Sequence, residues 1–193
     1  MSIVRICADP HFEHENMAKK RGFISAEEHD EYIVSKWNSV VGKQDITYIL
    51  GDITMEKISG YRYLDRLNGI KRVIGGNHDM LRHCHELLKH VESIGGMIKY
   101  KGIFLTHAPI HPRELKYRIP YNIHGHIHEY NCETHGLLGR WFKKKDPRYI
   151  CVSMEQIDYT PKTIEELIPG WDDKEFRNKF IWELKKKRKS ESN

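Results

Sequence analysis

Short apolar runs that end in glycine, aspartate or histidine recur along the first half of the chain. The first run covers residues 2–8, the second covers Ile46–Leu50, and the third covers 71–74. Each is followed by polar residues, which is typical of a short buried strand that ends in a tight turn. The pattern therefore predicts strands whose carboxyl ends carry polar side chains.

The segments between these predicted strands have apolar residues at helical spacing. Ser25 and Glu28 have the spacing of a capping box, and the apolar residues after them recur at intervals of three and four. The same spacing covers 58–67, and the segment that runs on to about Lys89 also favours a helix. Near the end of the chain, residues 171–188 show an amphipathic pattern that predicts a terminal helix.

The second half of the chain predicts short strands joined by turns. Residues 97–105 favour a hairpin around Lys101-Gly102, a short strand covers 121–123, and a last strand region covers 148–157. Alternating strands and helices followed by hairpin-like strands indicate a mixed α/β architecture. Neither a linker nor an internal repeat interrupts the pattern, so we predict one domain over residues 1–193.

The formal net charge of +5 comes from one short segment. Lys185–Lys189 supplies five cations, and the rest of the chain holds as many acidic as basic residues. A neutral body is unlike the basic surface expected of a protein with a long nucleic-acid groove. The basic tail, at about 185–193, fits two interpretations, which are a solvated chain end and a segment that binds polyanions.

Cysteine usage and hydropathy bear on the compartment. The four cysteines show no CxxC pairing, which favours reduced thiols and a cytoplasmic protein. No apolar stretch approaches the roughly 18 residues of a membrane helix, and the N-terminus does not resemble a signal peptide. We therefore expect a cytoplasmic protein without a membrane partner, and the sequence leaves its oligomeric state open.

Candidate chemistry lies at the ends of five strand-like runs. These ends are Asp9-Pro10-His11, Gly51-Asp52, Gly76-Asn77-His78-Asp79, Thr106-His107 and Gly125-His126-Ile127-His128. Sites in open α/β sheets form beyond the carboxyl ends of strands, so we expect these side chains to converge. Oxygen and imidazole donors without a thiolate suit manganese, iron, nickel or zinc. Seven donors are too many for one tetrahedral ion and fit two ions that share a carboxylate.

The five blocks, in this order, resemble the calcineurin-like metallophosphoesterase superfamily, whose pattern is DxH, GD, GNH(D/E), H and GHxH. The stretch from Asp9 to Asn16 and the segment Val152–Pro161 are similar to small bacterial and phage phosphoesterases of that superfamily. The resemblance spans about residues 2–168. It implies a four-layer α/β/β/α sandwich with a dimetal site at the carboxyl ends of the strands.

The resemblance also implies a role for each residue of the site. One metal would take Asp9, His11 and His128, the other would take Asn77, His107 and His126, and Asp52 would bridge them. His78 would face the scissile phosphate as an acid or charge stabiliser, with Asp79 fixing its orientation. The implied enzyme is a metal-dependent phosphoric ester hydrolase, with manganese as the first choice of metal and iron, nickel or zinc as alternatives. It would cleave phosphate mono- or diesters, small nucleotide-like or short diester substrates first, by attack of a metal-bridging hydroxide.

Two other functions fit the same sequence. A nuclease that acts on RNA or DNA ends would use the basic tail to hold its substrate, although the neutral body argues against a long footprint. A non-catalytic scaffold on the same fold would be expected to have lost metal ligands, and each expected position here carries a competent side chain.

Several residues near the blocks also have structural interpretations. Asp79 suits the cap of a following helix, His14 either extends the site toward substrate or faces solvent, and His124 is predicted to be structural. Arg113 and Lys116 either hold phosphate oxygens or lie in a solvated loop. The remaining histidines are predicted to lie at the surface, and they are His29, His83, His85, His90 and His135.

Overall fold

Two β-sheets form the framework of the molecule. The structure is a computed structural model that describes residues 2–115, 119–135 and 143–190, without the side chains of 134, 135, 143 and 187–190. The larger sheet has the strand order β11-β1-β2-β3-β4. Its strands are β1 (Val4–Cys7), β2 (Ile46–Ile49), β3 (Ile70–Ile74), β4 (Ser93–Gly95) and β11 (Lys162–Thr163). Strands β1 to β4 are parallel, so their carboxyl ends meet at one edge.

The second sheet has the order β10-β7-β6-β5. Its strands are β5 (Ile98–Tyr100), β6 (Ile103–Leu105), β7 (Asn122–His124) and β10 (Tyr149–Cys151). Strands β6, β7 and β10 are parallel, and β5 pairs with β6 as an antiparallel hairpin. A separate hairpin joins β8 (Glu133–His135) to β9 (Lys143–Lys145).

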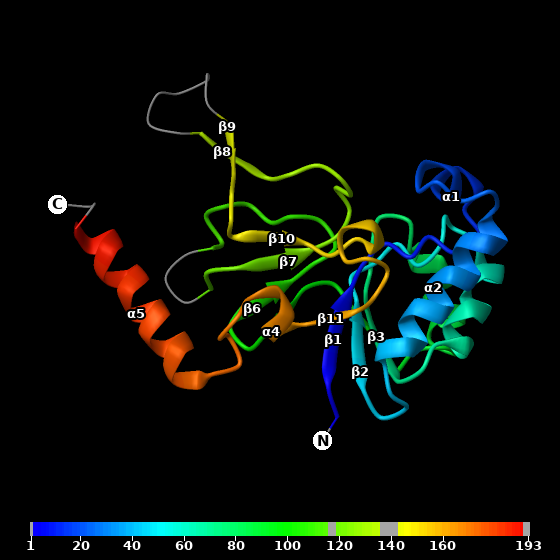
Figure 1. The fold of residues 1–193 in the computed structure, drawn as a ribbon, viewed down its shortest axis with the longest axis horizontal. Coiled ribbons are helices and arrows are strands. Elements are labelled where there is room, and N and C mark those ends of the chain that lie inside the picture. Colours follow the sequence, from blue (N-terminus) through cyan, green and yellow to red (C-terminus); the bar gives the residue numbers. More distant parts are fainter. Residues whose placement is uncertain (1, 116–118, 136–142, 191–193) are drawn as a thin grey trace.

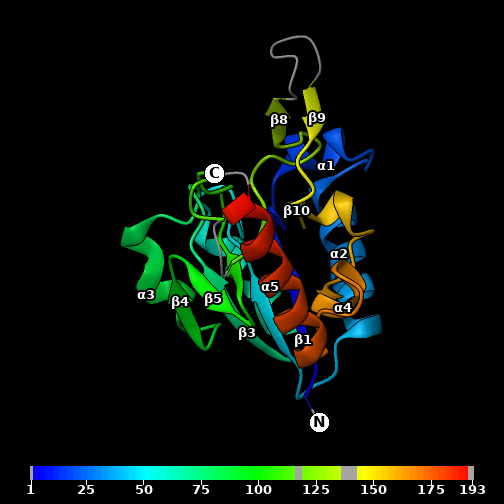
Figure 2. The same ribbon diagram turned by 90° about the vertical axis from the view of Figure 1, so that its left-hand side faces the viewer.

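Helices and 3₁₀ turns connect and flank the strands of the two sheets. They are α1 (Glu15–Lys20), α2 (Ala26–Val40), α3 (Cys84–Leu87), α4 (Ile164–Leu167) and α5 (Lys174–Ser190), with 3₁₀ turns η1 (Ile58–Arg66), η2 (Leu81–His83) and η4 (Met154–Gln156). Helices α1 and α2 lie beside the larger sheet, and α5 lies at the opposite side of the molecule, beyond the second sheet (Figure 1). The view in Figure 2 faces α5 and shows the strands of both sheets behind it.

One hydrophobic core joins the two sheets. Ile49 and Val73 of the larger sheet belong to the same buried cluster as Leu105 and Ile123 of the second sheet. Burial of this apolar surface is the main force that fixes one sheet against the other. The shared core therefore also fixes the relative positions of the loops that leave both sheets.

The structure confirms the predicted mixed α/β class, whereas the order of four layers and the single domain remain predictions. The hairpin at 97–105 is confirmed. The predicted capping box lies at a helix start, since Ser25 accepts from the Glu28 amide, and Thr163 with Glu166 forms a capping box at the start of α4.

Several elements differ from the prediction, among them the last strand region at 148–157, which is limited to β10 and followed by η4. Residues 58–66 form a 3₁₀ helix, in which Tyr61 and Leu64, three residues apart, both point into the core. The helix predicted up to Lys89 is limited to η2 and α3. The strand β4 follows in a segment that contains two glycines, and its pairing with β3 stabilises it.

None of the helices in the described ranges is long and apolar enough to cross a membrane.

Candidate metal centre

The five blocks lie together where strands of both sheets end. The blocks follow β1, β2, β3, β6 and β7 in turn. Backbone hydrogen bonds join neighbouring loops, from the Asp9 amide to the Gly51 carbonyl at 3.1 Å and from the Gly125 amide to the His107 carbonyl at 2.8 Å. The Asp9 carboxylate also accepts from the His126 amide at 2.8 Å, which joins the two sheets at the site itself.

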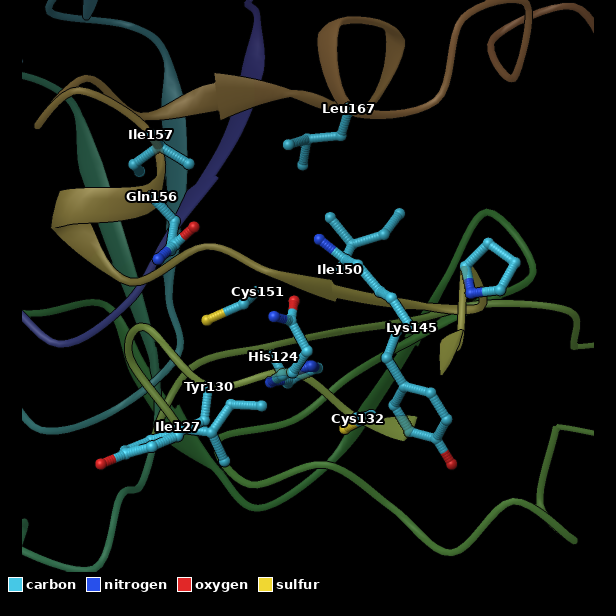
Figure 3. Close-up of a pocket in the computed structure, with 13 residues that line it drawn as sticks. His124, Ile127, Tyr130, Cys132, Lys145, Ile150, Cys151, Gln156, Ile157 and Leu167 are labelled. Atoms are coloured by element: carbon cyan, nitrogen blue, oxygen red, sulfur yellow. The ribbon is translucent and has the colours of Figure 1, made fainter. Parts of the chain in front are cut away.

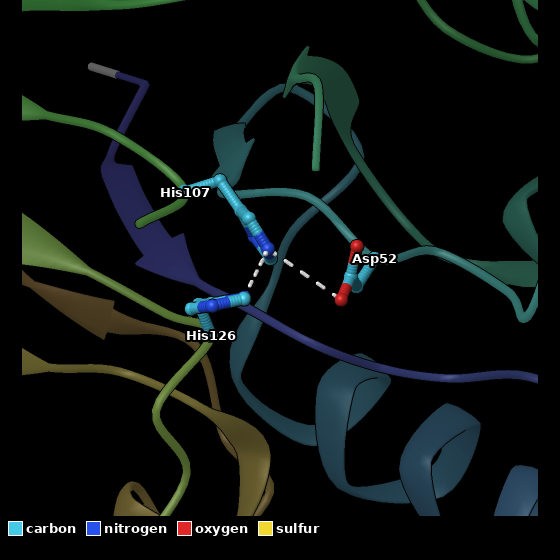
Figure 4. A group of neighbouring side chains, drawn as sticks. All are labelled: Asp52, His107 and His126. Atoms are coloured by element: carbon cyan, nitrogen blue, oxygen red, sulfur yellow. Dashed lines mark hydrogen bonds and ion pairs between the residues drawn. The ribbon is translucent and has the colours of Figure 1, made fainter. Parts of the chain in front are cut away.

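Two groups of potential metal-binding side chains share one carboxylate. Asp52, His107 and His126 form one group, and Asp9, His11 and Asp52 form the other. Within each group the ligand atoms all lie within 4.8 Å of one another. Figure 4 shows the His107 and His126 rings turned toward the Asp52 carboxylate. Asp52 therefore lies where a ligand bridging two ions would lie.

The group around His11 is buried and lacks internal partners. The His11 side chain is 3% exposed, and neither of its nitrogens has a hydrogen-bond partner among the described residues. Oδ1 of the fully buried Asp9 also has none. Buried polar atoms are nearly always paired, so such orphans need an explanation. A cation bound between these atoms satisfies both the carboxylate and the imidazole lone pair, so the residues fit a metal ion.

In the group around His107, one nitrogen of that ring bonds to the backbone and the other faces Asn77 and His126. The Leu50 carbonyl accepts from His107 Nδ1 at 2.8 Å, which leaves the lone pair of this imidazole on Nε2. That Nε2 lies 3.1 Å from His126 Nδ1 and 2.8 Å from Asn77 Oδ1. Three potential donor atoms for a metal thus meet at one point, and Asn77 and His126 open this point to solvent.

His128 belongs to the buried side of the centre. Its ring stacks on the His11 ring at a centroid distance of 5.4 Å. Its Nδ1 lies 2.7 Å from Glu155 Oε1. The structure therefore brings all seven predicted ligands to one place, where they lie as one buried and one more exposed set.

The backbone of the site adopts conformations that non-glycine residues seldom adopt. Five of the predicted ligands have positive φ angles, and they are Asp9, His11, Asp52, His126 and His128. Such conformations cluster at functional sites, where the surrounding structure holds them. Glycines allow the loops to approach, because a Cβ on Gly125 would lie 2.5 Å from Asp9 Oδ2 and one on Gly76 would lie 2.2 Å from Asp52 Oδ1.

Burial sets the charge of the side chains in the buried group. It raises the pKa of Asp9 to about 6, against the lowering effect of the Ser153 hydrogen bond and nearby histidines. It lowers the pKa of His11 to about 2, so this imidazole is neutral at physiological pH. A bound cation reverses the penalty on the Asp9 carboxylate and uses the lone pair of His11.

His78 lies over the centre with its backbone attached to Asp52. Its amide donates to Asp52 Oδ1 at 2.9 Å, and its ring lies 6.1 Å from the His11 ring. Its Nδ1 is 3.6 Å from Glu56 Oε1 and has no hydrogen-bond partner. The side chain is one-quarter exposed, so one edge of the ring is open to an incoming molecule.

Asp79 has a different position from the one expected. Its carboxylate accepts from three backbone amides, those of Asp52 at 2.7 Å, Gly76 at 2.9 Å and Ile53 at 3.1 Å. These bonds fasten the loop after β3 to the loop after β2. The interactions resolved for the described residues include no bond from Asp79 to the His78 ring, and the cap position of η2 is Met80. Asp79 therefore does not cap the following helix, and its role in orienting His78 stays a prediction.

Three side chains of the centre had no role in the sequence-based site. Ser153 Oγ donates to Asp9 Oδ2 at 2.5 Å, Glu155 contacts His128, and Arg21 contacts Glu155. The only signal for Ser153 and Glu155 was the segment Val152–Pro161, whose resemblance carried no residue role. Arg21 had no signal.

The outcome for the other histidines is mixed. His29 was expected at the surface and is fully buried, because Arg21 and Asp30 provide partners for both ring nitrogens. His124 is buried and bonds to the Gly125 carbonyl, as a structural residue would. His14 caps α1, with its ring 5.6 Å from that of His11.

The other histidines and the two loop cations are exposed, partly exposed or outside the described residues. His85 is exposed, and His83 and His90 are partly exposed. Arg113 is exposed in its loop. Lys116 lies outside the described residues, as does the side chain of His135.

A separate cavity of about 290 Å³ lies behind the second sheet (Figure 3). Cys151, Cys132 and His124 line it together with apolar side chains. Cys151 Sγ lies 3.2 Å from Ser153 Oγ, so this cavity and the metal centre share a wall. The cysteines that line it are free, and burial raises the pKa of Cys132 and Cys151, which disfavours their thiolate forms.

The fold and the site together define a mixed α/β protein with a candidate metal centre at its strand ends. No protein-family model matches the chain. The uncharacterized protein MJ1445 of Methanocaldococcus jannaschii is 30% identical over 178 residues, which are 87% of this chain and 90% of that protein. The chain belongs to the same family as this archaeal protein.

Two further relatives extend the comparison. The gene 66 protein of Mycobacterium phage L5 is 30% identical over 162 residues, which cover 66% of this chain and 78% of the phage protein. The crystal structure of AQ665, a protein of unknown function from Aquifex aeolicus, superposes with a TM-score of 0.62 at 26% identity. The superposition covers 86% of this chain and 98% of the Aquifex protein, so most of each chain shares the fold.

Proposed function

We propose that the protein is a dimetal phosphoesterase that hydrolyses phosphate mono- or diesters. The observation that carries the proposal is the position of Asp52, which belongs to both groups of potential ligands. Shared carboxylates are the means by which proteins hold two ions about 3.5–4 Å apart. The order of the five sequence blocks, which resembles calcineurin-like metallophosphoesterases, gives independent support.

Seven side chains would hold the ions. Asp9, His11 and His128 would hold one, Asn77, His107 and His126 the other, and Asp52 would bridge them. When bound, such a pair of ions supplies a water nucleophile at neutral pH and neutralises charge on the phosphoryl oxygens. The ligand set joins four imidazoles to three oxygen donors and has no thiolate, which suits manganese, iron, nickel or zinc, and we propose manganese first.

His78 is the proposed proton donor for the departing oxygen. Its backbone is attached to Asp52, while its ring has one open edge and no competing hydrogen bond at Nδ1. A group in this position can deliver a proton or a positive charge to the phosphate without ligating an ion. Asp79 would act indirectly, by holding the loop that carries His78.

Small nucleotide-like or short diester substrates suit this site best. The outer ligands Asn77 and His126 are exposed, so a phosphate can reach the ions from solvent. We further propose that the protein acts in the cytoplasm, where its four free cysteines would stay reduced.

The decisive experiment is a metal and substrate panel. Protein stripped of metal with a chelator is supplied with manganese, nickel, zinc or magnesium and assayed on bis-p-nitrophenyl phosphate, p-nitrophenyl phosphate and cyclic nucleotides. We expect hydrolysis that depends on added metal, with two ions per chain by elemental analysis. Metal-independent turnover, or a single ion at full activity, would reject the proposal.

A further inference from the structure

Arg21 lies at the centre of a buried hydrogen-bond network next to the metal centre. Its side chain is 2% exposed, yet all five of its N–H donors have acceptors. Two donate to Glu155 Oε2 at 2.6 and 3.0 Å, and two donate to the carbonyls of Asp9 at 2.9 Å and Pro10 at 3.3 Å. The fifth donates to His29 Nε2 at 2.9 Å.

The chemistry of Arg21 fixes the direction of every bond in this network, because a guanidinium only donates. His29 Nε2 must accept, so His29 Nδ1 carries the hydrogen and donates to Asp30 Oδ1 at 2.9 Å. Arg21 occupies Oε2 of Glu155, which leaves Oε1 to accept from His128 Nδ1 at 2.7 Å.

We propose that Glu155, held by Arg21, is a positioning residue that sets the tautomer of His128. A neutral imidazole has one N–H, so a hydrogen held on Nδ1 leaves a bare lone pair on Nε2. Carboxylates that hold a metal-binding histidine in this way orient the ring and increase its basicity. The inference rests on the proposed function for its consequence, which is the delivery of Nε2 to an ion.

The cost of the network supports a role beyond packing. His29 and Asp30 are fully buried, and Arg21 is nearly so. Buried charged groups seldom add net stability over apolar side chains of similar volume, so they are better explained by the geometry that they enforce. Here the enforced geometry includes the backbone carbonyls of Asp9 and Pro10, which precede the His11 ligand.

His107 and His128 thus carry their hydrogen on the same ring nitrogen, Nδ1, but different acceptors fix it there. His107 Nδ1 donates to the backbone carbonyl of Leu50, which no substitution removes. His128 depends on a side chain, so a single substitution can reverse its tautomer.

Glu155→Gln is the substitution that does so. Arg21 offers only hydrogens, so the glutamine carbonyl must turn toward Arg21 and its amide NH₂ toward His128. The amide then donates to Nδ1, and the hydrogen of the imidazole moves to Nε2, where it blocks metal binding. Nitrogen NMR of the histidine rings in metal-free protein at alkaline pH should show an Nδ1–H tautomer for His128 in the wild type and Nε2–H in the variant. Binding of one of two manganese ions should weaken about 10–100-fold, and binding of the other should be unchanged.

Glu129→Gln is the matched control. Glu129 follows His128 directly, but its carboxylate is exposed and pairs with Lys20. The same change of carboxylate to amide should leave the His128 tautomer and both metal affinities at wild-type values.

Each outcome separates this inference from the proposed function. If the Glu155→Gln variant keeps the Nδ1–H tautomer of His128 and both metal affinities, the inference is overturned. The proposed phosphoesterase function is not affected by that result. Wild-type protein that binds no metal overturns the phosphoesterase, while the tautomer comparison still decides the role of Glu155. If the variant does not fold, the wild-type spectrum decides, since an Nε2–H tautomer of His128 overturns the inference by itself.

Discussion

The two sides of the metal centre differ in how their donor atoms are satisfied. We call Asp9, His11 and His128 the inner group and Asn77, His107 and His126 the outer group, with Asp52 between them. In the inner group, both His11 nitrogens and one Asp9 oxygen have no hydrogen-bond partner in the part of the chain that the structure describes. In the outer group, His107 Nε2 can accept a hydrogen bond from His126 Nδ1 at 3.1 Å, while Asn77 Oδ1, at 2.8 Å, is a second acceptor.

From this difference we expect the two groups to bind their ions with different affinities. An unpaired buried polar group costs about 1–3 kcal/mol, so a cation that satisfies the inner group relieves a penalty. A cation in the outer group would have to replace the hydrogen between His126 Nδ1 and His107 Nε2, and it would do so next to solvent. We therefore expect the inner position to fill first and the outer position to exchange.

The largest effect should come from Asp52, which belongs to both groups. Asp52→Asn is expected to lower activity about 10³-fold or more, because the two-ion arrangement supplies several kcal/mol and each 1.4 kcal/mol is a factor of ten. Elemental analysis should find fewer than two ions per chain. The exposed Asp158→Asn serves as control and should match the wild type. Two ions and normal turnover in Asp52→Asn would remove the basis for treating the groups as one centre.

His78 tests whether the outer group includes a further ligand. His78→Ala should retain both ions and lose about 10²-fold in rate on esters with alkoxide-like leaving groups, within the range for a positioned general acid. The loss should be smaller for p-nitrophenyl esters, whose leaving group needs no proton. Loss of an ion would make His78 a ligand, and an equal rate loss across leaving groups would indicate charge stabilisation in place of proton transfer.

A pair of matched substitutions compares the groups directly. His11 and His126 both have positive φ, so glycine fits either backbone. Manganese at 100 times its Kd should stabilise the wild type by about 2.7 kcal/mol, which corresponds to roughly 5–10 °C in Tm for a chain of this size. His11→Gly should lose most of this metal-dependent rise, and His126→Gly should lose less. The opposite order in differential scanning fluorimetry would contradict the distinction between inner and outer groups.

The smallest effect is expected from the basic tail, which is remote from both groups in sequence. Helix α5 continues through this segment to Ser190, and the side chains from residue 187 onward lie outside the described residues. Deletion of 185–193 should leave hydrolysis of a small diester unchanged at every salt concentration. The nuclease would be favoured if the protein bound nucleic acid and the deletion flattened the salt dependence of that affinity. The slope of log affinity against log salt concentration would then fall by about one unit per lost phosphate contact.

The predicted ligands came together because of sheet topology. Parallel strands end at a common edge, so the polar residues after β1, β2 and β3 become neighbours when those strands pair, as do the residues after β6 and β7. The core that the two sheets share then places the two edges side by side. The sequence carried that information in the short apolar runs before each block. The conversion of a helix-like pattern at 58–66 into a 3₁₀ turn was less predictable, since spacing by three suits both.

The supporting residues were hidden for a different reason. His29 lies among Glu27, Glu28, Asp30 and Glu31, a charged run that is typical of a solvent-exposed helix face. Its burial depends on Arg21, which lies eight residues earlier, and on Glu155, which lies more than a hundred residues later. Buried networks assembled from distant polar residues leave no periodic signal, and local propensity cannot reveal them.

The bonds of the Asp9 carboxylate have a consequence for the order of assembly. It accepts hydrogen bonds from residues 117 and 144 positions later in the chain, His126 and Ser153. Contacts of such sequence separation form late, because long loops must close before they are made. During synthesis the first strand leaves the ribosome long before these partners exist. The centre can therefore be completed only after most of the chain has emerged, and we expect its ions to be acquired by the finished protein and not by the growing chain.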